Sequence, residues 1–276
     1  MIWIQASALA ALVGKHKYVP QHEALLELWA RHDPGCALLM REAGLRTAGQ
    51  RRRRAARAAE RAAPAEVAPL REALSAGHTV EERNAAEAAL SAAVRRGPGS
   101  PRTHKDAMEA LRSEAFTRRG VRDETTIVDN HAFSTATGVQ ERNNKMYTLA
   151  LAEDYGIRGR VDGLTDTHVI EAKRRMRRFF DSPPLYERVQ VHAYMAMTDR
   201  QKAQLVQHFD GEQRHDEIGF DSDLWDDTLA GLGAVMGWLR GALAMDPAGK
   251  RALLGRLPEL PPLRADPSAT PAGQVR

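Results

Sequence analysis

The sequence predicts an α/β (α+β) protein in which a central mixed β-sheet is flanked by helices. Two observations lead to this fold class. After Phe133, helical periodicity gives way to short β-like runs separated by turn residues such as "LTDT" and "DGEQ". A helix pattern at 185–198 divides these runs into three and two, and another at 221–243 closes the order α, β-β-β, α, β-β, α. The β-like runs are 145–153, 157–163, 168–174, 203–209 and 214–220.

The N-terminal half is expected to be helical. A short helix is predicted at "ASALAALVG", with Ser7 at its N-cap and Gly14 at its C-terminal end, and a second helix follows over 21–32. From about 44 to 102 the composition shifts to Ala, Arg and Glu without aromatic residues, and helices are expected around a break near Gly77. We interpret this Ala/Arg-rich segment as a helical insertion.

A further helix is expected over 104–133, interrupted or bent at Gly120. The chain length of 276 residues favours one main domain, and we place it at 1–256 with the insertion at 44–102. The last part, 257–276, is rich in proline and is expected to be disordered.

The composition excludes several classes of protein. No run of about 18 apolar residues is present, so no membrane span is predicted. The N-terminal stretch has neither the basic region nor the cleavage site of a secretory signal, and we expect an intracellular location, in the cytoplasm or nucleus. Cys36 is the single cysteine, which excludes an internal disulfide, a four-cysteine zinc site and a cysteine-ligated iron–sulfur cluster. Any bound metal must therefore be held by oxygen or histidine.

Positive charge is clustered although the net charge is only +4. The runs "RRRR" at 51–54 and "KRRMRR" at 173–178 are typical of surfaces that bind a polyanion. The first run fits a solvated helix face equally well. The second run follows an acidic group directly, and its arginines are the predicted DNA contacts: Arg174, Arg175, Arg177 and Arg178.

That acidic group lies in "RVDGLTDTHVIEAK", residues 160–173. Side chains alternate across a strand, so Glu171 and Lys173 share one face, and the hairpin brings Asp162 beside them. Two carboxylates and a backbone carbonyl, here that of Ala172, form an oxygen site suited to Mg²⁺ or Mn²⁺. Lys173 at the rim would stabilise negative charge on a phosphate, which is the design of a phosphodiesterase. The alternative is a surface hairpin with ordinary balancing charges.

Four motifs, in order, resemble a known family. "RVDG" followed by "IEAK" resembles the core of the PD-(D/E)XK nucleases, and "QVHAY" at 190–194 resembles the glutamine–tyrosine element of their RecB-like branch. "RRGVRDE" at 118–124 is similar to the helix that adds an acidic residue to the site. "ASALAALVGKHKY" is similar to the opening helix of the lambda exonuclease and YqaJ-type viral recombinase nucleases. The resemblance implies a restriction-endonuclease-like core and a viral or phage origin.

The resemblance also assigns roles. It implies that Glu124 joins Asp162 and Glu171 as a metal ligand, and that Lys173 serves the nucleophilic water. Gln190 would position Lys173 or the scissile phosphate. The catalytic set is thus Asp162, Glu171, Lys173, Glu124, Gln190 and Tyr194.

A terminal phosphate is the ligand implied for the first helix. The resemblance places Ser7 at a DNA phosphate, and free N–H groups at a helix start suit such an anion. Lys15 and Lys17 would reinforce it. The implied partners are linear duplex DNA with a 5′-phosphate, a single-strand annealing protein and further copies of the chain.

The implied activity is that of a metal-dependent DNA exonuclease, which degrades one strand of a duplex from its 5′ end in recombination, replication or repair. Two alternatives stay open: an endonuclease of the same superfamily and a catalytically silent DNA-binding scaffold. Structural roles are expected for His168 and His192, since neither has the spacing of a paired histidine site. Cys36 is expected to be an inert thiol.

Overall fold

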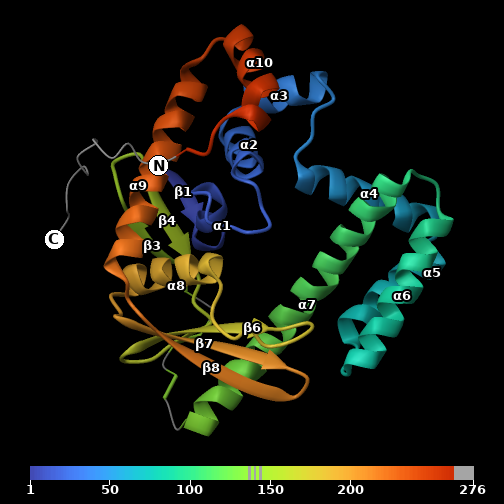
Figure 1. Cartoon of the computed structure of the whole chain (residues 1–276), viewed down its shortest axis with the longest axis vertical. Coiled ribbons are helices and arrows are strands. Elements are labelled where there is room, and N and C mark those ends of the chain that lie inside the picture. The colour runs from blue at the N-terminus through green and yellow to red at the C-terminus, as the bar shows by residue number, and fades with distance from the viewer. Residues whose placement is uncertain (136–137, 140, 143–144, 264–276) are drawn as a thin grey trace.

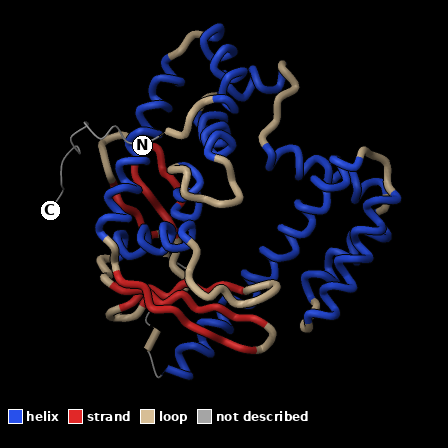
Figure 2. The backbone as a smooth tube through the Cα atoms, in the orientation of Figure 1, coloured by secondary structure: helices blue, strands red, loops and turns tan. Residues whose placement is uncertain are grey.

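The structure is a computed structural model of the chain, and it describes residues 1–135, 138–139, 141–142 and 145–263. Figure 1 shows an α/β body that holds every strand and, beside it, a group of helices reached through the long helix α7. Figure 2 shows the same division, with the strands gathered in one part of the molecule. The predicted α/β class, with mixed sheets flanked by helices, is confirmed.

The strands form two mixed sheets where one was expected. Three strands pair in the order β1-β4-β3, with β1 parallel to β4 and β3 antiparallel to it. Five strands pair in the order β2-β5-β6-β7-β8, and only β6 and β7 are parallel. The strands are β1 (Ile2–Gln5), β2 (Glu141–Arg142), β3 (Tyr147–Ala150), β4 (Tyr155–Gly159), β5 (Gly163–Leu164), β6 (His168–Arg174), β7 (Lys202–Phe209) and β8 (Glu212–Gly219).

The division into two sheets arises at residues 160–162. The chain leaves the first sheet after Gly159 and enters the second at Gly163, so the predicted run 157–163 is two strands joined by a bend. Opposite the bend, the Ala172 N–H donates to the Asp162 side chain. A side chain thus takes the place of a main-chain acceptor there, which ends the β-ladder next to β6.

Helices cover the first sheet and connect the parallel strands of the second. Since parallel strands need a crossover, α8 (Leu185–Thr198) links β6 to β7. The core of this body includes Trp29 of α2, which meets Trp238 of α9 edge to face with ring centroids 5.7 Å apart. The other helices of this body are α1 (Ala6–Leu12), α2 (Gln21–His32), α3 (Pro34–Glu42), α9 (Ser222–Ala244) and α10 (Pro247–Arg256).

The start of α1 differs from the prediction. Gln5 occupies the N-cap position, while Ser7 is the second residue of the helix and is exposed. The reason is that β1 runs directly into α1, which leaves no turn in which a serine cap would form. The predicted end is correct: Gly14 has φ +73°, and the Lys15 N–H donates to the Ala10 carbonyl at 2.7 Å.

The Ala/Arg-rich segment is helical and has its own hydrophobic core. This core contains Val67, Leu74, Leu90 and Leu111 and is separate from the core of the α/β body. The helix α7 is unbroken at Gly120, where an interruption or bend was expected, because a lone glycine weakens a helix without ending it. The helices are α4 (Ala48–Ala62), α5 (Pro64–Ala76), α6 (Val80–Arg96) and α7 (Pro101–Thr135).

The predicted tail is ordered where it begins. Leu257–Glu259 form the short 3-10 helix η1, and Leu257 is 2% exposed. The Leu263 N–H donates to Gln21 Oε1 at 2.8 Å. Apolar contact and this hydrogen bond hold 257–263 on the body, contrary to the expected disorder. The remainder, 264–276, lies outside the described residues.

Candidate functional site

Asp162 lies in the bend between the two sheets and connects this bend to the strand β6 through a hydrogen bond. Its Oδ2 accepts a hydrogen bond from the Ala172 N–H at 2.8 Å. The predicted approach of Asp162 to the segment Glu171–Lys173 is therefore present. The contact depends on the bend at 160–162, because this bend directs the Asp162 side chain toward β6.

Glu171 and Lys173 meet on one face of β6, as strand alternation predicts. Lys173 Nζ donates to Glu171 Oε1 at 2.5 Å. Glu171 is 3% exposed, whereas the Lys173 side chain is 23% exposed and reaches the surface. The second oxygen of Glu171, Oε2, is buried and has no hydrogen-bond partner among the described residues.

Gln190 and Tyr194 approach the same carboxylate from α8. Gln190 Nε2 donates to Glu171 Oε1 and to the Tyr194 hydroxyl, both at 3.0 Å. Gln190 Oε1 lies 3.3 Å from Lys173 Nζ. Residues four apart on a helix share a face, so one glutamine holds the acid, the lysine and the tyrosine together.

Close packing behind Tyr194 requires a glycine. A Cβ atom on Gly159 would lie 2.5 Å from Tyr194 Cε1 and 3.2 Å from the Ala6 Cβ. Tyr194 is 5% exposed. The end of β4, the start of α1 and the middle of α8 thus meet at Gly159, and this contact sets the position of Tyr194.

Glu124, on α7, acts on the other two acids through its charge. Burial raises the pKa of Asp162 well above its usual value, and the nearby charges of Glu171 and Glu124 raise it further. Burial also raises the pKa of Glu171, although the ion pair with Lys173 opposes it. For Lys173, burial alone would lower the pKa, but Glu171 and the other carboxylates outweigh it and raise the pKa. The site therefore holds acids that repel one another and one cation.

Part of a donor set for a divalent metal is present at Glu171. The unpartnered Glu171 Oε2 is a buried carboxylate oxygen, which is costly unless something binds it. Asp162 and the Ala172 carbonyl are the other donors expected beside it, with Glu124 from α7. Within the described residues, no group of three or more His, Cys, Asp or Glu side chains lies close enough together to hold a metal ion. Water and substrate oxygens usually complete the coordination of Mg²⁺.

Arg175 is buried in the protein, contrary to its predicted role as a DNA contact. Its side chain is 8% exposed and pairs with the buried Glu187, and its Nε donates to Gln207 Oε1 at 2.7 Å. The guanidinium also lies over the Phe180 ring, 4.2 Å from its centroid. The partners on α8 and β7 turn this strand-end arginine inward, so we remove it from the DNA-binding set.

Arg174 ties the end of β6 to α7. Its Nε lies 3.6 Å from Asp123 Oδ2, and its guanidinium contacts His208 on β7. Asp123 also lies 3.4 Å from Arg119, which donates to the Gly77 carbonyl. This chain of contacts connects the helices α4–α7 to the strand that carries Glu171. Sequence reasoning missed Asp123 and Arg119, since charged residues on a long helix predict only an exposed face.

The other basic residues predicted to bind DNA, two arginines and two lysines, differ in exposure and in their partners. Arg177 and Arg178 are exposed on the loop after β6, as a DNA contact would require. Lys15 forms an ion pair with Asp227 of α9, so its ammonium group already has an anionic partner. Lys17 is exposed and lies 5.7 Å from the centroid of the Tyr18 ring.

The residues expected to be structural have ordinary partners. His192 Nδ1 contacts the Arg188 carbonyl at 2.7 Å, and its Nε2 accepts from the Asp221 N–H at 3.0 Å. His168 contacts the Thr167 hydroxyl. Cys36 is fully buried, and burial raises its pKa to about 12, which agrees with the expected inert thiol.

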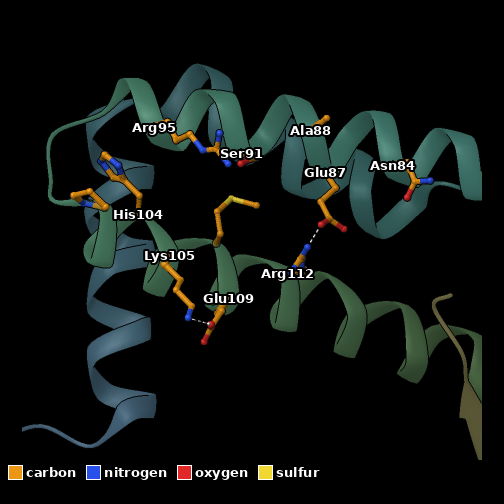
Figure 3. A pocket seen from close by; sticks show the side chains of 11 residues that line it. Asn84, Glu87, Ala88, Ser91, Arg95, His104, Lys105, Glu109 and Arg112 are labelled. Atoms are coloured by element: carbon orange, nitrogen blue, oxygen red, sulfur yellow. Dashed lines mark ion pairs between the residues drawn. The ribbon is translucent and has the colours of Figure 1, made fainter. Parts of the chain in front are cut away.

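A groove of about 880 Å³ lies between α6 and α7 (Figure 3). Four of its charged side chains form two pairs: Arg112 contacts Glu87, and Lys105 lies 4.0 Å from Glu109. The groove shares no residue with the acidic site. None of the described helices is long and apolar enough to cross a membrane.

Comparison with solved structures finds distant likenesses. The alkaline exonuclease LHK-Exo from Laribacter hongkongensis is 18% identical, with a TM-score of 0.39, over 72% of this chain and 98% of that one. LHK-Exo in complex with dAMP is 18% identical, with a TM-score of 0.39, over 70% and 96%. SSO0001 is 19% identical, with a TM-score of 0.34, over 45% of this chain and 63% of that one, which is less than two thirds of its length.

No model of a protein family matches the sequence, and a search of curated proteins finds no match either. Likenesses at these TM-scores carry no argument about activity. The chemistry of this chain therefore follows from its own acidic site and the side chains around it.

Proposed function

We propose that this chain is a divalent-metal-dependent deoxyribonuclease. More specifically, we propose an exonuclease that degrades one strand of linear duplex DNA from the 5′ end in recombination, replication or repair. The observation that carries it is the arrangement around Glu171: one oxygen is held by Lys173 and Gln190, while the other is buried without a partner among the described residues.

Each side chain has a distinct task in this proposal. Asp162, Glu171, Glu124 and the Ala172 carbonyl would hold Mg²⁺ or Mn²⁺, which when bound polarises a phosphate and makes water more acidic. Lys173 is placed by Glu171 and Gln190 with its ammonium partly exposed, where it stabilises negative charge that develops on the phosphate.

The surrounding groups keep this arrangement rigid. Gln190 uses both ends of its amide, so neither Glu171 nor Lys173 rotates without breaking a hydrogen bond. Tyr194 fixes the amide in turn. Such preorganisation matters because a catalytic group misplaced by about 1 Å loses much of its effect.

Two alternatives make different demands on the site. A silent DNA-binding scaffold has no use for the buried Asp162 and Glu171, since burial, and for Asp162 also the charge of Glu171, raises their pKa and lowers stability. An endonuclease would use the same chemistry but accept DNA without ends. The 5′-phosphate contact at Ser7, the annealing-protein partner and the homo-oligomer belong to the finer proposal, and the sequence resemblance supports them.

The experiment compares three substrates: linear duplexes labelled at one end and bearing a 5′-phosphate or a 5′-hydroxyl, and a covalently closed circle. Each is incubated with Mg²⁺, Mn²⁺, Ca²⁺ or excess chelator. We expect cleavage of linear DNA with Mg²⁺ or Mn²⁺, faster on the 5′-phosphate, and none with chelator. Ca²⁺ should bind without supporting turnover, because its looser coordination fits the catalytic arrangement poorly.

Other outcomes would change the assignment. Full activity in chelator would exclude the metal site, and digestion of the closed circle would identify an endonuclease. DNA binding without cleavage under every metal condition would favour the scaffold.

A further inference from the structure

Three aromatic rings gather at the junction of the α1–α2 loop and the start of α8, and we call His16, Tyr18 and Tyr186 the aromatic cluster. The His16 and Tyr186 rings are nearly stacked, with centroids 4.6 Å apart and planes inclined by 31°. Tyr18 meets Tyr186 edge to face at 6.1 Å and His16 at 6.2 Å. The cluster therefore joins a loop near the N-terminus to the helix that carries Gln190.

The cluster is open to solvent on one side. Tyr18 is 65% exposed, and its chain neighbour Val19 and the neighbour of Tyr186, Leu185, are 36% and 43% exposed. Three of the ten exposed large hydrophobic residues in the described part of the chain thus belong to these two short segments. Single exposed apolar residues need no explanation, whereas exposed apolar and aromatic side chains that gather in one place are typical of an interaction surface.

The loop holds Tyr18 in place without burying it. His16 Nδ1 accepts hydrogen bonds from the N–H groups of both Tyr18 and Val19, each at 3.1 Å. Beyond the loop, Gln21 Nε2 donates to the Leu12 carbonyl at 2.7 Å. The ring is thus presented by an ordered backbone, which lowers the entropy lost when a ligand stacks on it.

The cluster lies directly beside the acidic site. Tyr186, Gln190 and Tyr194 are spaced four residues apart on α8, so they lie along one face of the helix. Gln190 contacts both Glu171 and Lys173. Burial raises the pKa of Tyr186, and Lys173 is near enough to oppose this shift. About one helical turn of roughly 5.4 Å separates Tyr186 from Gln190, which corresponds to about one to two nucleotides of a DNA strand.

The charged side chains indicate which kind of ligand the aromatic cluster binds. Lys17 lies 5.7 Å from the centroid of the Tyr18 ring, and the exposed Arg177 and Arg178 follow β6, so the surroundings favour an anionic ligand with a flat apolar part. A nucleotide has both features, because its base has a π-face and its phosphate is negative. An apolar peptide would leave these cations without partners.

We propose that the aromatic cluster stacks a nucleobase of the strand whose phosphodiester lies at Glu171 and Lys173. The cluster would hold an unpaired base one or two nucleotides from the bond that is cut, and would accept any base since stacking is tolerant of sequence. This inference rests on the proposed function and names the form of DNA that the site takes, a strand with an unstacked base.

The test uses the full chain with Ca²⁺ and a DNA strand that carries 2-aminopurine, whose fluorescence falls when it stacks. We expect the wild type to quench the probe when it occupies one of the first positions from the 5′ end. Tyr18→Leu and Tyr186→Leu keep an apolar side chain but remove the ring. Each should reduce quenching and weaken binding about five-fold or more, in line with the strength of base–aromatic stacking.

Two controls separate stacking from a change in the loop. Phe133→Leu removes another exposed aromatic residue, 92% exposed at the end of α7, and should leave quenching unchanged. An abasic nucleotide at the probe position should weaken binding by the wild type but not by Tyr18→Leu, because that variant no longer has the ring on which the base stacks.

The possible failures are distinguishable. If the chain cleaves DNA normally and Tyr18→Leu quenches as the wild type does, the aromatic cluster is not a base platform, and the proposed function stands. If abasic and intact strands bind the wild type equally, this inference is also overturned. If the chain neither binds nor cleaves any DNA, the proposed function fails and this inference with it.

Discussion

The Arg175 guanidinium and the Glu187 carboxylate form a two-point ion pair inside the protein, with Nη1–Oε1 and Nη2–Oε2 distances of 2.6 Å and 2.8 Å. The two side chains are 8% and 5% exposed. Glu187 lies in the first turn of α8, one turn before Gln190 on the chain. The pair therefore anchors the helix that supplies Gln190 to the strand that supplies Glu171.

This pair predicts a large difference between two arginine substitutions. Arg175→Met leaves Glu187 buried without its partner and should lower the free energy of unfolding by about 3–5 kcal/mol. Arg240→Met breaks a two-point pair with Asp154 in which both side chains are about half exposed, and should lower it far less, because solvent screens the pair. Urea unfolding of both variants measures the difference, and equal losses would show that burial of the first pair is unimportant.

A second prediction concerns the repulsion between the acids. The pKa of Asp162 is raised in the folded state. Stability therefore falls as the pH rises from the usual pKa of an aspartate toward the raised pKa of Asp162. Asp162→Asn should therefore raise the thermal midpoint without metal, abolish cleavage and reduce the stabilisation that Mg²⁺ or Mn²⁺ provides. Asp166→Asn, on the exposed turn of the same hairpin, is the matched control and should change neither cleavage nor the stabilisation by metal. Near-normal turnover in Asp162→Asn would place the site elsewhere.

A third prediction tests the packing behind Tyr194. Gly159→Ala places a Cβ 2.5 Å from Tyr194 Cε1, so it should shift the tyrosine, weaken the Gln190 contact and reduce both stability and cleavage. Gly237→Ala on the exposed face of α9 meets nothing within 4 Å and should stabilise the protein by about 0.5–1 kcal/mol. If Gly159→Ala retains full stability, the close contact at Tyr194 does not exist in solution.

A fourth prediction follows from His208. Burial, and then the charge of Arg174, lowers its pKa from 6.5 to about 4. Between these values the unfolded chain binds a proton that the folded chain does not, so stability rises with pH and is lost as the pH falls from about 6.5 toward 4. His208→Gln should flatten the stability profile in this window. An unchanged slope would mean that other groups carry the acid sensitivity.

A fifth prediction separates the arginines of the loop after β6 from an ordinary charged face. Arg177→Ala with Arg178→Ala should weaken DNA binding and lower the salt dependence by about 0.9 units of slope for each phosphate that the protein no longer neutralises. Arg53→Ala with Arg54→Ala removes the same charge from α4 and tests the solvated-face interpretation of 51–54. Equal slopes for wild type and the first variant would exclude a phosphate contact at this loop.

Much of the acidic site was predictable because its spacing is local. Alternation on a strand places Glu171 and Lys173 on one face, and a helix places Gln190 and Tyr194 together. A hairpin brings Asp162 to the facing strand. The structure shows each of these contacts, whereas the binding of a metal and of DNA remains a prediction.

Other features were not readable from the sequence. The burial of Arg175 depends on Glu187 and Gln207, which come from elements that are distant along the chain. The exposure of Ser7 depends on β1 running straight into α1. In both cases a residue type that suits one role locally is given another by its neighbours in space.

The sequence by itself determined the periodic elements, the acidic residues and their spacing, because these depend on side-chain direction within one strand, hairpin or helix. Only the tertiary structure decided the division into two sheets, the helical group with its own core and the cluster of His16, Tyr18 and Tyr186 beside Gln190. The physical reason is that burial and side-chain contact are properties of packed elements, which local periodicity does not specify.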